Sequence, residues 1–255
     1  EWVDARSCIK TDNFYRSAHL NWEQTQAAIQ DQIQGNVLKV TQGFIASDEN
    51  NFTTTLGREG ADYSAAIFAY CIGATDVTIW KDVQGILNAD PRVFDKTQLL
   101  EHISYQEAIE LAFYGASVIH PKTLQPLQRK EIPLYVKSFL NPKQRGTKVA
   151  KGVRMRPEIP CYIVKKGLSL LRLSTRDFSF VVEDNISDIF KLLHEHKMSV
   201  DVIQNSAISF SVCVQDKYRN MDALLLSLRS RFDVKHTPDV SLYTIRHFEE
   251  NSAKM

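Results

Sequence analysis

Apolar and polar residues alternate with two different periods along the first half of the chain. Short β-branched or aromatic runs have the pattern of buried strands, and apolar residues spaced three or four positions apart indicate helices between them. The expected strands are 37–40, 53–55, 77–80 and 132–136, and the expected helices are 62–73, 104–112 and one that opens at 121–124. This alternation predicts an α/β fold with a mainly parallel sheet covered by helices.

One of these helix starts carries a specific signal. Ser104 precedes the helix, and Glu107 follows three residues later. In a capping box the serine side chain accepts from a backbone N–H of the first turn, and the glutamate reaches back to the N–H of the capping residue. The sequence predicts both bonds here.

The second half has the pattern of a smaller unit. Prolines and glycines fall among basic residues around 141–160, which predicts a linker or domain boundary. Beyond it, the expected strands are 168–173, 199–204 and 208–214, and the expected helices are 186–197 and 221–232. One more strand begins at 241–248. The order β-α-β-β-α-β describes a ferredoxin-like sandwich.

A glycine-bracketed turn lies between the threonine run 53–55 and the helix that follows it. It contains Arg58 and ends at Asp62, in the first helical turn. The N–H groups of a helix start attract anions, and arginine can hold a carboxylate with two parallel hydrogen bonds. The alternative is a capped helix start with a surface arginine. Because ligands of open sheets sit at the carboxyl ends of strands, this turn and the turn 80–82 are candidate site segments.

Composition and charge exclude several classes of function. The net charge is +1, and no basic stripe interleaved with aromatics marks a nucleic-acid surface. No apolar run approaches the roughly 18 residues of a membrane span, and no signal peptide is found. We therefore expect neither a nucleic-acid nor a membrane partner.

Cysteines and histidines give no sign of a metal site. The four cysteines lie far apart without a CxxC pair, which argues against a zinc or redox motif and suits a reducing, cytoplasmic location. His194 and His196 are two positions apart on an expected helix, so they do not share a face. We expect no protein-bound metal cluster.

Several ordered motifs together resemble those of the aspartokinases. The family's L-G-R-G-G-S-D signature corresponds to residues 56–62, and its W-T/K-D-V-D-G-V-x-x-x-D-P-R segment corresponds to residues 80–92. The block E-L-A-x-F-G-A-K-V-L-H-P corresponds to residues 110–121, and a D-A-R segment to residues 4–6. The second half is similar to the family's ACT regulatory domain, above all at 199–206.

The resemblance implies a fold and a domain plan. The fold is an α/β amino-acid-kinase three-layer sandwich, present as its C-terminal portion, followed by a ferredoxin-like ACT domain. The expected domains are 1–152 (catalytic portion), 153–166 (linker), 167–240 (ACT) and 241–255 (start of a second ACT unit). The family's N-terminal K-F-G-G-[ST] motif does not occur among the 255 residues. We therefore expect a chain truncated at both ends whose kinase activity, measured alone, is at background.

The resemblance also implies a reaction, in which ATP with Mg²⁺ phosphorylates the side-chain carboxylate of L-aspartate. This is the first step of the pathway to lysine, threonine and methionine. Phosphoryl transfer depends mainly on positioning and charge neutralisation. The implied catalytic residues are Asp62 and Arg58, and the implied substrate-binding residues are Arg58, Glu59, Gly60 and Ala61. The implied nucleotide-binding residues are Trp80, Lys81, Asp82, Ile86, Leu87, Asp90, Pro91, Arg92 and Ser117.

Some of these residues have structural alternatives. Arg92 is expected to reach the phosphates but could form a surface ion pair, and Pro91 could belong only to a turn. Asp82 could be an N-cap or an Asx turn. His120 is better interpreted as a satisfied core histidine than as a catalytic group.

Four positions depart from the family pattern. Glu59 replaces a glycine, which removes conformational freedom and adds a negative charge near a substrate with two carboxylates. Ala61 replaces a serine, at a cost on the order of 1 kcal/mol for one neutral hydrogen bond. Lys81 stands where many members have Thr or Ser, and Ser117 where many have Lys. Our hypothesis is that Lys81 supplies the cation that Ser117 lacks.

The ACT-like half implies regulation. Ser199, Val200, Asp201 and Ser206 are the candidate effector contacts, with lysine or threonine as effector and Asp201 facing a cationic end. Paired ACT units imply a homodimer or a higher oligomer. Ala207 stands in place of a glutamate, which is a departure from the effector-binding pattern.

Two other functions compete with this interpretation. The chain could be a non-catalytic fragment or paralogue that senses an amino acid through its ACT unit. It could also be another amino-acid kinase, such as glutamate 5-kinase or acetylglutamate kinase, but the ACT pattern and the block at 110–121 argue against that.

Overall fold

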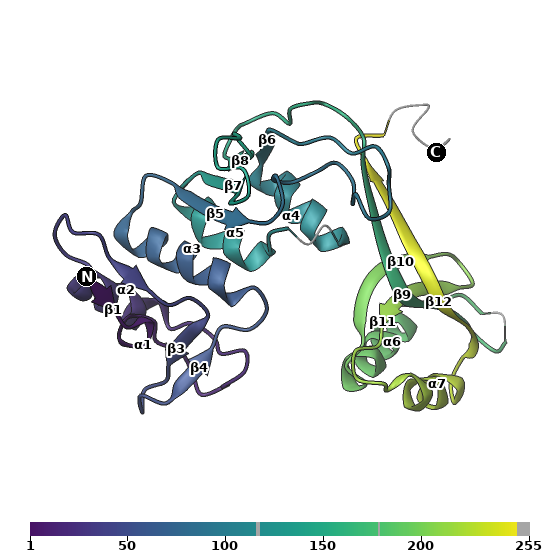
Figure 1. The fold of residues 1–255 in the computed structure, drawn as a ribbon. Helices are drawn as coiled ribbons and strands as arrows, with labels where there is room; N and C mark the ends of the chain where they lie inside the picture. Colours follow the sequence, from purple (N-terminus) through teal and green to yellow (C-terminus); the bar gives the residue numbers. More distant parts are fainter. Residues whose placement is uncertain (116–117, 178, 249–255) are drawn as a thin grey trace. The chain divides into compact units, whose positions relative to one another are not determined.

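The computed structural model describes residues 1–115, 118–177 and 179–248 (Figure 1). Within this part the chain forms two compact units. The first contains Glu1–Ile163 and the segment that starts at Ile245, and the second contains Val164–Thr244. Each unit is described separately below.

A four-stranded sheet forms the centre of the first unit. Its strand order is β5 (Val77–Lys81), β7 (Leu134–Ser138), β8 (Thr147–Ala150) and β6 (His102–Ser104). Helices α3 (Gly60–Ile72), α4 (Tyr105–Tyr114) and α5 (Pro121–Arg129) lie along one side of it (Figure 1). Side chains from both layers form one buried cluster that includes Ala66, Leu100, Ile103, Leu111, Leu124, Leu134, Val136 and Val149.

Two of the three strand pairs in this sheet are parallel, which agrees with the expectation of a mainly parallel sheet, and the third pair departs from it. β5 pairs with β7 in parallel, and β6 pairs with β8 in parallel, but β7 and β8 are antiparallel. The physical reason is the connection between them, residues 139–146, which contains no helix. A parallel pair needs a crossover of a dozen residues or more. β8 also lies inside the stretch 141–160, which was expected to be a linker or domain boundary.

The sequence pattern missed most of the N-terminal elements. The structure places α1 at Ala5–Cys8 and α2 at Trp22–Gln32, and β1 (Trp2–Val3) pairs in parallel with β2 (Val40–Thr41). The strand expected at 37–40 is thus reduced to its last residue. An unexpected strand, β3 (Ile45–Ser47), forms an antiparallel hairpin with β4 (Thr53–Thr55).

The three helices predicted in the first unit are confirmed as α3, α4 and α5, but one cap is only half right. Ser104 Oγ accepts from the backbone N–H of Glu107 at 3.1 Å, as predicted. The Glu107 carboxylate instead accepts from the Arg246 guanidinium at 2.8 and 3.0 Å. Two charge-assisted hydrogen bonds to a guanidinium are stronger than one hydrogen bond to a neutral N–H. The Glu107 carboxylate therefore binds the distant arginine and not the N–H of the capping residue.

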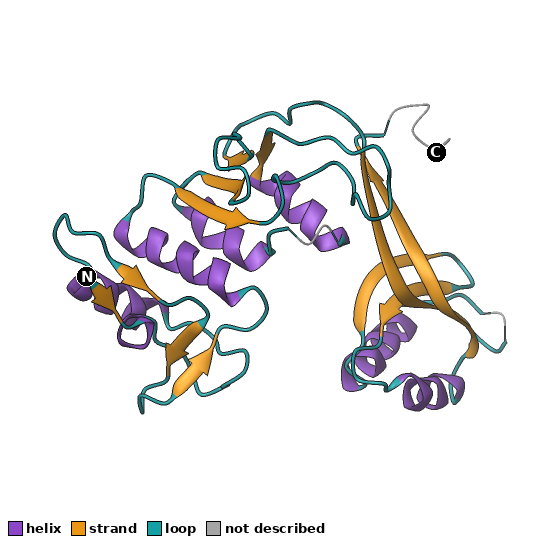
Figure 2. Ribbon diagram, viewed as in Figure 1, coloured by secondary structure: helices purple, strands orange, loops and turns teal. Residues whose placement is uncertain are grey.

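The second unit contains the predicted β-α-β-β-α-β order. Its sheet has the strand order β10 (Ser199–Asn205), β11 (Phe210–Gln215), β9 (Cys161–Ser174) and β12 (Asp233–Arg246). α6 (Glu183–Glu195) and α7 (Met221–Arg229) pack on one side of it (Figure 2). The strand expected from 241 starts earlier, at Asp233, so residues 241–246 are the end of β12.

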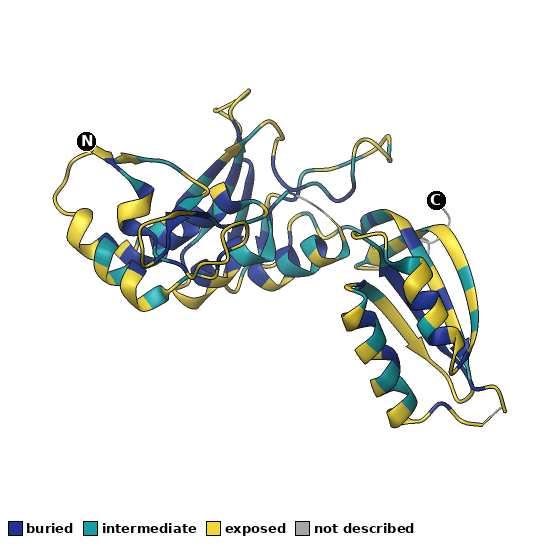
Figure 3. Cartoon of the chain, turned by 90° about the horizontal axis from the view of Figure 1, so that it is seen from below, coloured by how far each residue is buried: buried dark blue, intermediate teal, exposed yellow. Residues whose placement is uncertain are grey.

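Amphipathic patterning explains how this second unit packs. Ile189 and Leu193 of α6 and Leu224 and Leu228 of α7 are buried against Phe210, Val212, Val214, Leu171 and Leu173 of the sheet. Figure 3 shows buried residues along the strands and exposed residues on the outer sides of the helices. In neither unit is any described helix long and apolar enough to cross a membrane.

Candidate functional site

The turn between β4 and α3 has an unusual backbone. Gly57 has φ +77°, and a Cβ there would lie 2.8 Å from Ser17 Oγ. Gly60 starts α3, and a Cβ on it would lie 2.7 Å from the Phe44 ring. Both positions need glycine, for backbone freedom at the first and for space at the second. The glycine bracket therefore fixes where α3 begins.

The start of α3 leaves backbone donors free. The N–H of Gly60 donates to Gly57 O at 3.1 Å, and that of Tyr63 donates to Glu59 O at 3.1 Å. Between them, the N–H groups of Ala61 and Asp62 donate to no described residue. Free N–H groups and the positive end of a 13-residue helix together favour an anion.

Asp62 forms an ion pair with Lys81. Asp62 Oδ2 lies 2.8 Å from Lys81 Nζ, and the two side chains are 18% and 21% exposed. Asp62 is in the first turn of α3, and Lys81 is the last residue of β5. The fold therefore brings together two motifs that lie 19 residues apart in the sequence, at the carboxyl end of a strand, as predicted.

Arg58 and Glu59 lie beside this pair in the sequence but differ in exposure. The Arg58 side chain is 71% exposed and that of Glu59 is 20% exposed, with Arg58 Nε 4.0 Å from Glu59 Oε1. Glu59 Oε2 is buried and has no described hydrogen-bond partner. Glu59 has φ +54°, the left-handed conformation that suits glycine. The backbone at Glu59 thus adopts a conformation that favours glycine, at the position where the family pattern has Gly.

Lys122 belongs to the same corner, although the sequence analysis did not single it out. Its Nζ donates to Leu56 O at 3.2 Å and lies 4.9 Å from the centre of the Tyr63 ring. Burial lowers the pKa of Lys122. A cation in the first turn of a helix is disfavoured by the helix dipole. The unfavourable position of this lysine is the feature of the sequence that could have identified it as a candidate site residue.

His120 caps α5. Its Nδ1 accepts from the N–H of Lys122 at 3.1 Å, which agrees with the interpretation as a satisfied histidine. Burial lowers the pKa of His120, and the nearby charge of Glu59 opposes this effect. The start of α5 therefore adjoins the β4–α3 turn.

The segment after β5 is held by hydrogen bonds to residues far away in the sequence. The N–H of Ile86 donates to Thr147 Oγ1 at 2.8 Å, and the side-chain amide of Asn88 donates to Pro160 O at 3.0 Å. Ile86 is buried, Leu87 is half-buried, and Asp82 and Pro91 are exposed. A Cβ on Gly85 would lie 2.6 Å from Thr147 Oγ1, so glycine permits this close approach.

Arg92 and Trp80 show two different surroundings for predicted nucleotide residues. The Arg92 guanidinium binds the Asp90 carboxylate through Nε at 3.0 Å and NH2 at 2.7 Å, which is the ion pair considered as its alternative. The Trp80 side chain is exposed, with Lys137 Nζ 5.9 Å from the ring centre. Ser117 lies outside the described residues.

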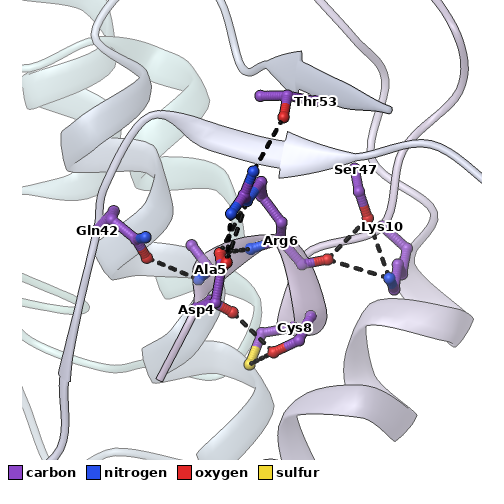
Figure 4. A network of polar contacts seen from close by, with 9 residues as sticks. Asp4, Ala5, Arg6, Cys8, Lys10, Gln42, Ser47 and Thr53 are labelled. Atoms are coloured by element: carbon purple, nitrogen blue, oxygen red, sulfur yellow. Dashed lines mark hydrogen bonds and ion pairs between the residues drawn. The ribbon is translucent and has the colours of Figure 1, made fainter. Parts of the chain in front are cut away.

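A polar network around α1 supports the strand that leads to the turn (Figure 4). Arg6 pairs with Asp4 at 2.6 Å and donates to Thr53 Oγ1 at 3.4 Å, at the start of β4. Gln42 Oε1 accepts from the N–H of Ala5 at 2.8 Å. The D-A-R segment thus holds β4, and within the described residues no hydrogen bond or ion pair joins it to the Asp62–Lys81 pair.

The predicted effector residues lie on β10 and just after it in the second unit. The pairing of β10 with β11 shifts register between Val200 and Val202, so Asp201 sits at a bulge. Its carboxylate pairs with Lys165 and is 7% exposed, and its Oδ2 has no described partner. Ser206 Oγ lies 2.9 Å from Ser209 Oγ. Ser199 and Val200 are half-buried.

Comparison with known proteins defines the class of the chain. Residues 2–138 match the sequence model of the amino acid kinase family. Lysine-sensitive aspartokinase 3 of Escherichia coli is 35% identical over 215 residues, which cover 83% of this chain and 48% of the relative. A bifunctional aspartokinase/homoserine dehydrogenase 2 of Arabidopsis thaliana is 33% identical over 76% of this chain and 22% of its own length.

A solved structure gives the same result. E. coli aspartokinase III in complex with aspartate and ADP superposes with a TM-score of 0.78 at 30% identity, covering 95% of this chain and 56% of that one. The chain therefore belongs to the amino acid kinase family, within its aspartokinase branch. It spans about half the length of this aspartokinase and of aspartokinase 3, and less of the bifunctional relative.

Proposed function

We propose that this chain supplies the substrate and nucleotide corner of an aspartate kinase, which transfers the γ-phosphoryl group of ATP to the side-chain carboxylate of L-aspartate. The proposal rests on the relatives above, one of which is described in complex with aspartate and ADP. In such a protein the reaction would begin the synthesis of lysine, threonine and methionine.

The observation that carries the proposal is the Asp62–Lys81 pair next to free helix N–H groups. Lys81 Nζ, held at 2.8 Å by Asp62, supplies positive charge at a strand end. The free N–H groups of Ala61 and Asp62 and the exposed guanidinium of Arg58 provide donors for a carboxylate. Phosphoryl transfer between two anions depends on fixed positive charges and hydrogen-bond donors of this kind.

The nucleotide is assigned to the far side of Lys81. Trp80 offers an exposed aromatic surface, and Lys137 lies beside it. Residues Asp82, Ile86, Leu87, Asp90, Pro91 and Arg92 continue from that strand end, where ligands of open sheets bind. In this arrangement the Arg92 guanidinium would leave the Asp90 carboxylate and bind a phosphate. Alternatively, it would keep its bond to Asp90 and hold the conformation of the nucleotide segment.

Mg²⁺ is assigned to the nucleotide rather than to a protein cage. In the described part of the chain no three His, Cys, Asp or Glu side chains cluster as metal ligands. Mg²⁺ usually needs only one or two carboxylates plus substrate phosphates, and Asp82 is exposed beside Lys81. When bound, the ion would neutralise phosphate charge, and the chain's own residues would orient the two substrates.

The second unit is assigned to regulation. Its ferredoxin-like fold and the match to a lysine-sensitive relative support an ACT unit that responds to lysine or threonine and joins two or more copies. Asp201 is the proposed contact for a cationic effector, although Lys165 pairs with its carboxylate. The cytoplasm is the proposed location.

A chimera tests the proposed reaction. The chain is joined behind the part of E. coli aspartokinase 3 that precedes the match, and aspartyl phosphate is trapped with hydroxylamine. We expect aspartate-dependent product, and about a 100-fold loss of turnover in Asp62→Asn, because losing the orientation of reacting groups costs about that much. The control is Asp188→Asn, which removes the exposed ion pair with Arg231. Equal turnover in both variants, or no product from the unmodified chimera, would contradict the proposal.

A further inference from the structure

Glu59 combines three features that are each unfavourable. Its backbone has φ +54°, and a side chain in this conformation costs about 1–2 kcal/mol. Its side chain is only 20% exposed. Its Oε2 atom is buried without a described hydrogen-bond partner. Such strain persists only where the surroundings compensate for it, and it often marks a functional position.

The compensation is electrostatic. Glu59 is the residue before α3, so its carboxylate lies near the positive end of that helix. Its Oε1 is 4.0 Å from Arg58 Nε, and its charge also acts on His120 at the start of α5. Arg58 and the start of α3 are the groups that the proposed function assigns to a substrate carboxylate. The chain's own carboxylate is therefore placed among the donors meant for the ligand.

We propose that Glu59 is an affinity-setting residue whose carboxylate competes with the carboxylate of the amino-acid substrate for Arg58 and the start of α3. This inference rests on the proposed function of the same corner. A substrate anion entering the corner must either displace Glu59 or accept a like charge near it. Glu59 therefore keeps substrate affinity low and leaves the nucleotide side unaffected.

Two substitutions separate charge from backbone strain. Glu59→Gln keeps the size and the left-handed backbone but removes the charge. Glu59→Gly removes both the charge and the strain. The matched control is Glu131→Gly, because Glu131 also has a left-handed backbone, φ +57°. It lies beyond the C-terminal end of α5, the opposite end from His120.

The experiment measures the dissociation constants of L-aspartate and of Mg·ADP by isothermal titration calorimetry, using the 255-residue chain and its variants. We expect Glu59→Gln and Glu59→Gly each to bind L-aspartate about fivefold to tenfold more tightly than the parent. This is the scale of one unit charge a few ångströms away in a partly screened site. Mg·ADP binding should change by less than about twofold, and Glu131→Gly should match the parent in both titrations.

The outcomes distinguish this inference from the proposed function. If Mg·ADP and L-aspartate bind the parent and both Glu59 variants equally, the competing role is wrong and the proposed function stands. Weaker aspartate binding in Glu59→Gln also overturns it, since Glu59 then assists the substrate. Tighter binding in Glu59→Gly alone overturns it in favour of backbone strain. If neither ligand binds any of the proteins, the proposed function itself fails.

Discussion

Two aspartate–lysine pairs, one in each unit, use the same chemistry in different surroundings. Asp62 and Lys81 join a helix start to a strand end, and their side chains are 18% and 21% exposed. Asp201 and Lys165 lie on the sheet of the second unit, and their side chains are 7% and 24% exposed. The first carboxylate lies beside free backbone donors, whereas the second is more deeply buried at a β-bulge.

The difference teaches how a pair's surroundings decide its role. A pair at a helix start can exchange its partner for a ligand, because the helix start stabilises the carboxylate and solvent reaches both side chains. In a buried pair each charge needs the other, because loss of one partner leaves an uncompensated buried charge that destabilises the fold. We therefore expect the first pair to matter mainly for binding and the second mainly for stability.

The largest expected effect is on the buried pair. Lys165→Met should lower the free energy of unfolding of the second unit by about 3 kcal/mol, because it strands the buried Asp201 carboxylate. Urea unfolding followed by circular dichroism measures this loss. Lys166→Met is the control, since Lys166 is the exposed neighbour. Adding Asp201→Asn to Lys165→Met should restore part of the loss, and equal destabilisation by both lysine variants would break the contrast.

Lys81→Met should show the opposite balance. We expect a loss of stability below about 1 kcal/mol, the usual scale for accessible pairs. Mg·ADP should bind about tenfold more weakly, which corresponds to about 1.4 kcal/mol, and the effect on aspartate affinity should be smaller. Calorimetric titration checks both ligands. The control is Lys151→Met, which removes a surface ion pair with Glu131. Equal losses of affinity for Mg·ADP and for aspartate in Lys81→Met would contradict the assignment of Lys81 to the phosphates.

A third carboxylate allows a test by pH. Burial raises the pKa of Glu107, but hydrogen bonds and charge from Arg246 and His247 outweigh this and hold it below its ordinary value of 4.5. The ionised form thus stabilises the fold above about pH 4.5, and the contribution disappears as pH falls through the lowered folded-state pKa. Urea unfolding between pH 6 and 3 should show a steeper acid loss in the parent than in Glu107→Gln. Glu110→Gln, at a more exposed carboxylate, should titrate like the parent.

The smallest expected effect concerns the left-handed glutamates. Glu59→Gly and Glu131→Gly should each raise the free energy of unfolding by about 0.5–1 kcal/mol, because relief of backbone strain exceeds the entropy cost of glycine. Thermal unfolding measures both. If Glu131→Gly raises the free energy of unfolding and Glu59→Gly does not, the surroundings of Glu59 stabilise its carboxylate by more than the backbone strain costs.

Much of the fold could be predicted because it depends on local periodicity. The second unit follows from alternating residues such as those of β11 and from the apolar stripe of α6, and the Ser104 cap is a local signal. Contacts between distant residues could not be found this way. Arg246 takes the Glu107 carboxylate from 139 positions away, and the antiparallel β7–β8 pair follows from a connection that looked like part of a linker.

The site shows the same division. The glycine bracket, Arg58 and Asp62 were recognisable as a helix start, and the strand end at Lys81 was predicted to lie at a ligand-binding edge. The direct Asp62–Lys81 bond, the contact of Lys122 with Leu56 O and the orphan oxygen of Glu59 depend on how three elements meet. No single segment contains that information.

The burial of every cysteine gives the protein a set of internal reporters. Cys8 and Cys71 lie in the N-terminal core, Cys161 lies in the core of the central sheet, and Cys213 lies on β11 of the other unit. Burial raises the pKa of Cys71 to about 11 and that of Cys161 to about 12, so the native thiols are poor nucleophiles. Pulsed alkylation followed by peptide mass mapping would therefore record the opening of each region separately. The native cysteines are the reporters, so no cysteine has to be introduced.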